Sequence, residues 1–281
     1  MDATSCTERK IERVVHGLGM KSNPGSYRVK LAETEEEILG ARRLRYRVFV
    51  EEKGASARQE EHALRQEWDQ FDPHFDHLVL IADDPSISDP LDRVVGAYRL
   101  MRGDAAKNGV GFYSASEYDL ELLQQSGRRL VELGRSCISR DHRGGLGMHL
   151  LWSELAAYVL ERDIEILFGV ASFHGTDPGL IADALAYLYH NFLAPRDLRV
   201  RALEGHHLDM NLLPDGSFNT SRASSQIPPL LKSYLRLGGF VGDGAFIDRG
   251  FNTIDVCVVM DTKRMKQTYR RFYERGRSGS V

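Results

Sequence analysis

The apolar positions of the chain follow a strand period first and a helix period soon after. Residues 27–32, YRVKLA, alternate between apolar and polar side chains, as a half-buried strand does. Residues 34–52 then carry apolar side chains at helical spacing behind Thr34, a residue type that caps helices, and three glutamates. The pattern predicts a strand followed by a helix.

The middle of the chain predicts four strands and one helix. Residues 77–84 and 93–102 are typical of successive strands that are joined by a loop containing Pro and Ser. A further strand is expected at residues 128–140, an amphipathic helix of about four turns at 147–163, and an apolar strand at 164–173. The helix between these last two strands is typical of a mixed α/β fold.

The last third of the chain has a less regular pattern. A helix is expected at residues 177–192, with an aspartate as its cap and a proline at its first position. Residues 206–229 are mostly loop-forming types, and a short helix that ends in glycine is expected at 229–239. Residues 253–260, TIDVCVVM, predict a final strand.

These segments predict one domain with an elaborated C-terminal half. No linker separates two apolar regions, and neither an internal repeat nor a long low-complexity run is found. A length of 281 residues is enough to bury a sizeable core. We expect a flexible tail at residues 1–26, the folded domain at 27–262 and a basic tail at 263–281.

Composition indicates an ordinary cytoplasmic protein. Hydrophobic residues make up 42% of the chain, and no apolar run approaches the length that crosses a bilayer. The first 26 residues lack the apolar core and cleavage site of a secretory signal. Three cysteines far apart, Cys6, Cys137 and Cys257, suggest neither a disulfide framework nor a thiolate zinc site.

The net charge of −3 hides a basic C-terminal segment. Residues 263–277 carry seven basic side chains and one acidic side chain. A solvated helix face is the plain interpretation, and an anionic protein, an anionic lipid surface or nucleic acid are the functional ones. Nucleic acid is the weakest of these, because no zinc finger or helix-turn-helix pattern accompanies the charge. We therefore expect no nucleic-acid partner.

The junction between the strand at 128–140 and the helix at 147–163 is a candidate anion site. A glycine-rich turn at a helix N-terminus presents unpaired backbone N–H groups and the positive end of the helix dipole. Glycines also occur in plain tight turns, and the turn is neither a P-loop nor a dinucleotide fingerprint. The candidate phosphate-binding residues are Arg140, Arg143, Gly144, Gly145 and Gly147.

This order of elements, with RDHRGGLG at the junction, resembles the GNAT acyltransferase fold. The resemblance implies a mixed central sheet flanked by helices, and a turn that holds the pantetheine arm and phosphate of an acyl carrier. The usual pattern spaces its glycines as R-G-x-G-x-G, whereas Arg143 is followed by G-G-L-G. The shortened turn argues against ordinary acetyl-CoA binding.

Further motifs are similar to two groups of GNAT-like enzymes. LRYRVF, EWDQFD, YRL and ELGR fall in the order and spacing of the acyl-homoserine-lactone synthases. The segment PPLLKSYLRLGGFVGDGAFIDRGFNTIDVCVV, residues 228–259, resembles the L-ornithine Nα-acyltransferases. The likeness spans roughly residues 27–273. By this match the polar cluster of such enzymes corresponds to Arg45, Phe49, Asp69, Asp72, Arg99, Glu132 and Arg135.

The second resemblance implies transfer of a 3-hydroxyfatty acyl group from acyl carrier protein to the α-amine of L-ornithine, which gives lyso-ornithine lipid. The 4′-phosphopantetheine arm of the carrier would be the donor, with no permanently bound cofactor and no metal. An acyl-homoserine-lactone or other N-acyl amino acid synthase is the alternative enzyme. A non-catalytic acyl-carrier-binding or lipid-binding module is the alternative from another class.

Roles for the polar residues follow from this chemistry. Glu132 could take the proton of the α-ammonium, or it could pair with Arg135; a direct pair would need a bulge, since residues three apart lie on opposite faces of a regular strand. Arg99 and Arg135 are candidates for gripping a carboxylate. Asp69 and Asp72 could take the distal ammonium or cap a turn, and Arg45 is assigned to substrate binding with them.

Other groups receive simpler interpretations. By the fold analogy, backbone N–H groups near Gly134, where two strands part, could form an oxyanion hole. Cys137 is expected to be a core residue and not a nucleophile, because it lies on an apolar strand. The histidines lack a strong metal-ligand pattern and are expected to be polar loop or rim residues: His74, His77, His206 and His207.

Two hypotheses concern apolar contacts. Residues 184–195 could line an acyl tunnel, although their helical spacing favours core packing. The basic tail could bind an acidic acyl carrier protein or make a peripheral contact with the inner face of the membrane.

Overall fold

The computed structural model describes residues 26–144 and 146–265. Residues 1–25 of the tail predicted at 1–26 and most of the basic tail predicted at 263–281 lie outside these ranges, and Ser26 is already the first residue of a strand. No helix within them is long and apolar enough to cross a membrane.

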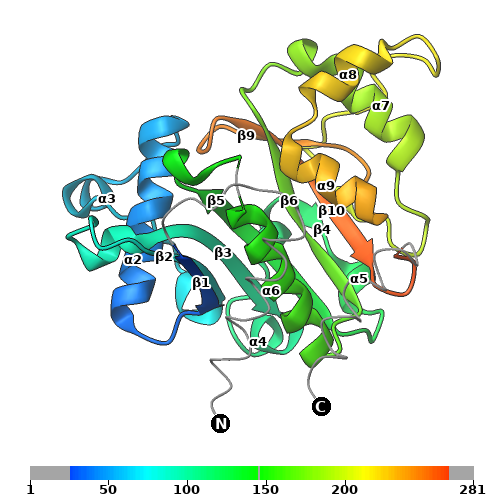
Figure 1. Ribbon diagram of the computed structural model, residues 1–281. Helices are drawn as coiled ribbons and strands as arrows, with labels where there is room; N and C mark the ends of the chain where they lie inside the picture. Colours follow the sequence, from blue (N-terminus) through cyan, green and yellow to red (C-terminus); the bar gives the residue numbers. More distant parts are fainter. Residues whose placement is uncertain (1–25, 145, 266–281) are drawn as a thin grey trace.

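A mixed sheet forms the centre of the molecule, in the order β1-β2-β3-β5-β6-β10-β8, with β9 paired to β10 (Figure 1). Its strands run antiparallel to their neighbours, except β5 and β6, which are parallel. The strands are β1 (Ser26–Leu31), β2 (Asp76–Asp83), β3 (Val94–Arg102), β5 (Leu130–Ile138), β6 (Ile166–His174), β8 (Phe240–Val241), β9 (Phe246–Asp248) and β10 (Thr253–Asp261). A second, two-stranded sheet pairs β4 (Tyr118–Asp119) with β7 (Arg201–Ala202).

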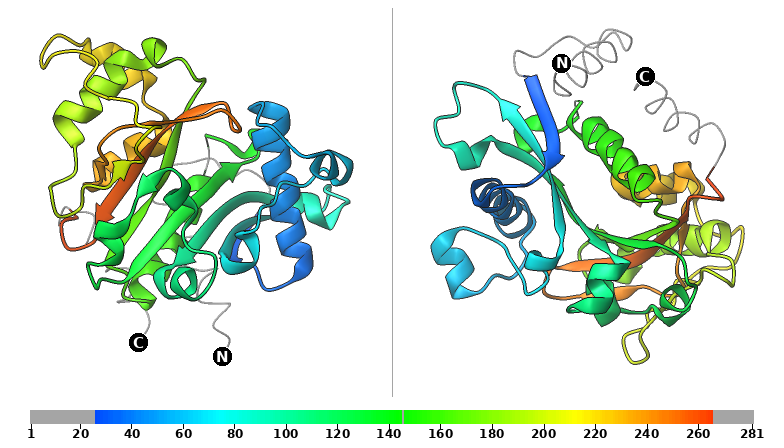
Figure 2. Two further views of the ribbon diagram at one scale, coloured as in Figure 1. Left: turned by 180° about the vertical axis from the view of Figure 1, so that it is seen from behind. Right: turned by 90° about the horizontal axis from the view of Figure 1, so that it is seen from below.

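Helices lie on both faces of the sheet (Figure 2). The α-helices are α2 (Glu35–Arg45), α3 (Gln59–Leu64), α4 (Gly103–Asn108), α5 (Glu121–Gln124), α6 (Gly147–Glu161), α7 (Ala182–Phe192), α8 (Thr220–Gln226) and α9 (Pro229–Leu237). One π-helix, η1 (Tyr46–Glu52), continues α2. The 3₁₀ helices are η2 (Asp72–His74), η3 (Pro90–Arg93), η4 (Tyr113–Ser116), η5 (Arg140–His142) and η6 (Pro178–Ile181).

Three apolar clusters hold the layers together. The largest joins one face of the sheet to α6, α7 and α9, for example through Leu151, Leu188 and Leu231. On the opposite face, Ala41 and Leu44 of α2 pack against β2 and β3, and a third cluster lies beside the far strands around Phe168. The α/β fold predicted from the sequence is confirmed.

The elements with a clear period were predicted correctly, and irregular segments were not. Thr34 caps α2 as expected: its Oγ1 accepts a hydrogen bond from the Glu37 amide at 3.2 Å, but the α-helix gives way to the π-helix at Tyr46. Asp177 caps the 3₁₀ helix η6, and α7 begins only at Ala182. The loop predicted at 206–229 contains α8, because the Asn219 side chain caps this short, largely polar helix.

Strands β5 and β6 separate part-way along their length. Their register runs from Leu130 opposite Ile166 to Glu132 opposite Phe168 and stops there. Gly169 then passes so near β5 that a Cβ atom on it would lie 2.1 Å from the Leu133 carbonyl oxygen. Glycine is therefore required where the two strands begin to part.

Gly169→Ala is expected to destabilise the protein, because the new methyl group meets backbone that cannot move aside without breaking the sheet. Overpacking of this kind costs about 1–3 kcal/mol. Urea denaturation would measure the loss. Gly134→Ala is the matched control on β5, since its Cβ would meet only Phe75, at 3.9 Å. Equal free energies of unfolding for the two variants would contradict this account.

Candidate active site

A cavity of about 910 Å³ occupies the gap between β5 and β6. On one face of the sheet its wall is mostly apolar and includes Met148 of α6 with Leu231 and Tyr234 of α9. On the other face its wall carries ionisable and aromatic side chains, which are Arg99, Tyr113, Glu132, Arg135, Asp248 and Asp255. The cavity thus joins an apolar compartment to a polar one.

Glu132 lies on β5 at the last residue pair before the strands part. Its side chain is buried, and its two carboxylate oxygens accept hydrogen bonds from the backbone amides of Tyr113, at 2.9 Å, and Ser114, at 2.6 Å. Burial raises its pKa, and the hydrogen bonds from Ser114 and Tyr113 partly oppose that rise. Glu132 is therefore a fixed carboxylate with increased proton affinity in the cavity wall.

Two fully buried arginines are neutralised beside the cavity. Arg45 contacts Glu67 Oε2 at 2.6 Å and Asp72 Oδ2 at 2.7 Å. Arg99 contacts Asp69 Oδ1 at 2.8 Å and Asp72 Oδ1 at 2.5 Å, and lies 4.3 Å from the centre of the Phe75 ring. Four of the residues predicted to bind substrate thus form one buried ionic network.

Arg135 joins this network to the cavity. It has a left-handed backbone conformation, with φ of 52°, beside an irregularity in the pairing of β3 with β5. Its guanidinium group contacts Glu67 at 3.0 Å and Asp69 at 3.4 Å, and lies over the rings of Tyr113 and Phe251. The irregularity in β5 that a direct Glu132–Arg135 pair would require is present. Arg135 nevertheless forms its ion pairs with Glu67 and Asp69.

Asp69 stabilises the turn as well as the network, whereas the Asp72 carboxylate belongs to the network alone. Asp69 Oδ1 accepts hydrogen bonds from the amides of Phe71 and Asp72 at 3.0 and 3.1 Å. Asp72 Oδ2 also accepts one from Arg42, at 2.9 Å. The capping interpretation therefore holds for Asp69, and both carboxylates already have arginine partners. This arrangement leaves them poorly placed to take the ammonium group of a substrate.

The glycine-rich turn is only partly described, because Gly145 lies outside the described residues. The Arg143 guanidinium contacts both carboxylate oxygens of Glu52, the second at 2.7 Å, and its Nε donates to the Ile138 carbonyl oxygen at 2.9 Å. Arg140 is exposed. Gly147 begins α6, and a Cβ there would lie 2.8 Å from Leu80 Cδ2, so a larger residue would have to displace the Leu80 side chain between α6 and β2.

Comparison with known proteins decides the family. Residues 44–153 match the model of the acetyltransferase (GNAT) domain. The chain is 52% identical to the L-ornithine N(alpha)-acyltransferase of Rhodobacter capsulatus, over 91% of this chain and 98% of that protein. It is 41% identical to the protein of the same name in Brucella abortus, over 89% of each.

The chain belongs to the L-ornithine Nα-acyltransferase family. The match to the GNAT model also confirms the fold expected from the sequence. Among solved structures, an N-acyl amino acid synthase from uncultured soil microbes has a TM-score of 0.48 and 11% identity, covering 85% of this chain and 92% of that one. That likeness is too slight to add to the assignment.

Cys137 and the histidines of this acyltransferase have the surroundings of structural residues, with one correction. Cys137 is buried, and burial raises the pKa of its thiol to about 12, which suits a core residue. His74 and His206 are exposed. The prediction was wrong for His77, which is buried at the start of β2, with its Nε2 2.9 Å from the Asp72 carbonyl oxygen.

The proposed acyl tunnel wall at residues 184–195 is mostly core. Ala184, Leu185, Ala186 and Leu188 are fully buried, and none of these four lines the cavity. The apolar wall comes mainly from β6, α9 and β10 instead.

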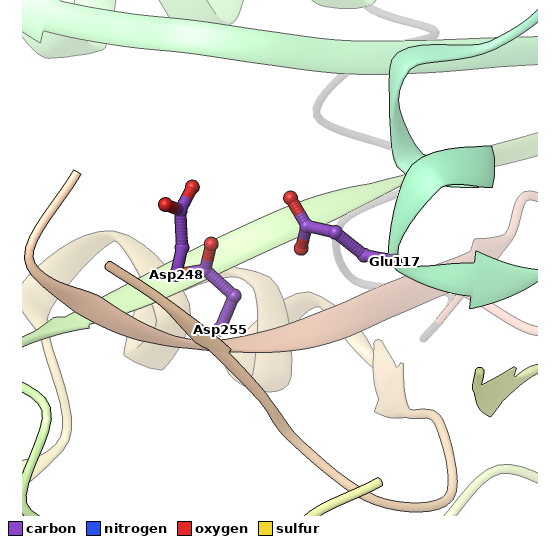
Figure 3. Close-up of side chains that lie close together, drawn as sticks. All are labelled: Glu117, Asp248 and Asp255. Atoms are coloured by element: carbon purple, nitrogen blue, oxygen red, sulfur yellow. The ribbon is translucent and has the colours of Figure 1, made fainter. Parts of the chain in front are cut away.

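Three carboxylates of the acyltransferase were missed by sequence reasoning. Glu117, Asp248 and Asp255 each bring a carboxylate oxygen within 4.8 Å of the others (Figure 3). They come from three segments without a shared motif, and Asp248 and Asp255 become neighbours only because β9 pairs with β10. This group contains carboxylates alone. It has neither the arginines of the polar cluster predicted from the sequence nor the histidines considered as metal ligands.

The ionic network makes the folding stability of the acyltransferase depend on pH in the acid range. Burial alone raises the pKa of Glu67, but the charges of Arg45, Arg135 and Arg99 outweigh burial and lower it to about 2. A carboxyl group whose folded-state pKa is lowered contributes stability above its ordinary pKa of 4.5 and loses it as the pH falls toward 2.

We expect the free energy of unfolding to fall between pH 4.5 and pH 2 in the wild type, and less steeply in Glu67→Gln. At pH 7 this variant should lose roughly 3–5 kcal/mol, because Arg45 keeps a buried charge with one partner fewer. Urea denaturation across this pH range tests both points. The exposed Glu204→Gln is the control for charge removal, and an identical acid limb in wild type and Glu67→Gln would refute the assignment.

Proposed function

We propose that this chain transfers a 3-hydroxyfatty acyl group from acyl carrier protein to the α-amine of L-ornithine and so makes lyso-ornithine lipid. Membership of the L-ornithine Nα-acyltransferase family supports ornithine as the acceptor. The observation that carries the mechanism is the buried Glu132 carboxylate at the point where β5 and β6 part beside the cavity.

Glu132 acts as the general base in this proposal. It takes a proton from the α-ammonium of ornithine, directly or through a water molecule, and the neutral amine attacks the thioester carbonyl. The new C–N bond forms a tetrahedral oxyanion, which then expels the pantetheine thiolate as the C–S bond breaks. Glu132 passes its first proton to the thiolate, and the restored carboxylate then takes the second proton from the new amide nitrogen and releases it to water. The neutral amide and the free thiol leave, and one proton enters the solution.

Backbone groups of β5 beyond Glu132 stabilise the oxyanion in this scheme. The register of β5 with β6 ends at Glu132, so the edge of β5 around Gly134 faces the cavity and not a neighbouring strand. Backbone N–H groups at such an edge are rigid donors that suit a developing negative charge.

Arg135 is the residue that we assign to the carboxylate of ornithine. It lines the cavity, and its planar group can present a fork of donors to a carboxylate. The buried ion pairs around Arg135 fix its position and cancel most of the local charge. The residues that act on the substrate in this indirect way are Arg45, Arg99, Asp69 and Asp72. They are positioning residues in this proposal.

The donor thioester reaches the same point from the other side of the sheet. The fatty chain would lie in the apolar compartment against α9 and β10, where Leu230, Tyr234, Val258 and Met260 line the wall. The phosphate of the pantetheine arm would meet Arg140, Arg143 and the backbone near Gly144 and Gly147, with Arg143 exchanging Glu52 for the phosphate.

A peripheral contact with the membrane belongs to the same proposal and would appear as salt-sensitive flotation with anionic liposomes.

Mass spectrometry of products tests the donor and the acceptor together. Purified full-length protein is incubated with 3-hydroxyacyl-acyl carrier protein and a mixture of ornithine, lysine, glutamine and S-adenosylmethionine. We expect an ornithine amide, and no comparable product when acyl-CoA replaces the carrier protein. A lactone would indicate an acyl-homoserine-lactone synthase, and bound carrier without product would indicate a non-catalytic module; each result contradicts the proposal.

Glu132→Gln is expected to lower kcat by a factor of roughly 10²–10⁴, the usual contribution of a general base. Because the base must be ionised, the wild-type rate should rise with pH through the raised pKa of Glu132, and this limb should be lost in the variant. Steady-state kinetics across pH measures both. The exposed Glu121→Gln serves as control, and an unchanged pH limb in Glu132→Gln would show that another group is the base.

A further inference from the structure

Glu117, Asp248 and Asp255 form an acidic cluster on the polar side of the cavity. Asp255 lies on β10 and Asp248 on β9, on the same face of the hairpin and diagonally across its register, in which Thr253 is opposite Asp248 and Asp255 is opposite Phe246. Glu117 is brought to them by its neighbour Tyr118, whose hydroxyl group donates to the carbonyl oxygens of Gly244 and Asp255 at 3.0 and 2.9 Å. Figure 3 shows the three carboxylates turned toward one another.

The acidic cluster has no cationic partner among the described residues. None of the ion pairs found within residues 26–144 and 146–265 involves Glu117, Asp248 or Asp255. Glu117 and Asp255 are 2% and 3% exposed, yet Glu117 Oε2 and Asp255 Oδ1 have no hydrogen-bond partner there. Buried carboxylate oxygens without partners are costly, so their presence beside a cavity points to a group that satisfies them when it is bound.

Protonation, and not a cationic side chain, reduces the negative charge of the acidic cluster. Burial, then the charges of Asp255 and Asp248, raise the pKa of Glu117 to about 9, against the opposing effect of Arg135. Burial also raises the pKa of Asp255 to about 6. Glu132 is the remaining charged group that acts on Glu117, and it too raises this pKa. The cluster is thus short of positive charge.

The acidic cluster and the proposed base are fixed by the same short segment. The amides of Tyr113 and Ser114 at the start of η4 hold Glu132, and Glu117 follows directly after η4. Asp248 and Asp255 line the same cavity as Glu132. An acceptor amino acid with its α-amine at Glu132 can therefore direct its side chain to the cluster.

We propose that Glu117, Asp248 and Asp255 bind the side-chain ammonium group of the acceptor and thereby select a diamino acid over a neutral amino acid. This inference rests on the proposed acylation of ornithine and assigns its specificity. Asp69 and Asp72, the carboxylates favoured by the sequence, already neutralise buried arginines. The acidic cluster instead offers unpaired oxygens beside the cavity.

The test compares L-ornithine with L-2-aminopentanoate, which has the same carbon chain without the distal amine. The wild type should strongly prefer ornithine in kcat/KM. Asp255→Asn and Glu117→Gln should raise the KM for ornithine by a factor of roughly 30 or more, as loss of one partner of a buried charge pair does, with a smaller change in kcat. Turnover of 2-aminopentanoate should not fall, so the preference for ornithine shrinks.

A separate measurement guards against variants that merely unfold. A carboxyl group of raised pKa destabilises the folded state at pH 8, because Glu117 must be protonated and Asp255 must bury a charge. Replacement by a neutral amide removes that cost, so the thermal midpoint of both variants at pH 8 should equal or exceed that of the wild type. Glu204→Gln, which removes one exposed negative charge, is the matched control and should keep the wild-type preference.

Calorimetry tests the pocket independently of turnover. Binding of ornithine at pH 8 should release a proton from the wild type, because an ammonium group favours ionised Glu117, and release none from Glu117→Gln. Release should be absent with 2-aminopentanoate. If the wild type binds ornithine in this way but forms no amide, the proposed reaction fails and the pocket stands.

Other results would overturn the inference. Unchanged discrimination in both variants would show that the acidic cluster does not contact the acceptor. Stoichiometric binding of Mg²⁺, Ca²⁺ or Mn²⁺ that is lost in Asp255→Asn, together with loss of activity on chelation, would make it a metal site instead.

Discussion

The separation of β5 from β6 is the constraint on which the rest of the molecule depends. Parallel strands that stay paired leave no room between them, and here the pairing stops after Glu132. The close approach of Gly169 to the Leu133 carbonyl oxygen fixes where the strands diverge. From that point the cavity passes from one face of the sheet to the other, so its apolar and polar compartments meet where the strands part.

The gap between β5 and β6 exposes polar groups of the sheet to the cavity, and the protein places buried ion pairs beside it. Arg45 and Arg99 have almost no exposed surface, and they are stable there because Glu67, Asp69 and Asp72 surround them. Replacing one partner leaves a buried charge unbalanced, which is more costly than losing an exposed ion pair. The network therefore makes the wall of the cavity rigid at Arg135, which contacts Glu67 and Asp69.

Periodic segments could be predicted from the sequence because their apolar side chains recur at regular spacing and pack into the clusters on the two faces of the sheet. The strands β1, β2, β3, β5, β6 and β10 and the helices α2, α6 and α9 were found in this way. The strands β4, β7, β8 and β9 have two or three residues each, too few to show a period. Motif resemblance located Glu132 and Arg135, but no local pattern shows which carboxylate neutralises which arginine. The Glu117, Asp248 and Asp255 cluster was invisible for the same reason, since it is created by the pairing of β9 with β10 and by the Tyr118 hydroxyl group.

The η4 turn has an evolutionary consequence. Glu132 is bound by backbone amides of this turn, and every residue type except proline has such an amide. The sequence of the turn can therefore change while the carboxylate stays in place. The β9–β10 hairpin carries Asp248 and Asp255 on a separate part of the chain. By the specificity proposed above, a descendant of this protein can acquire a different acceptor by changes in the hairpin alone and keep its reaction chemistry.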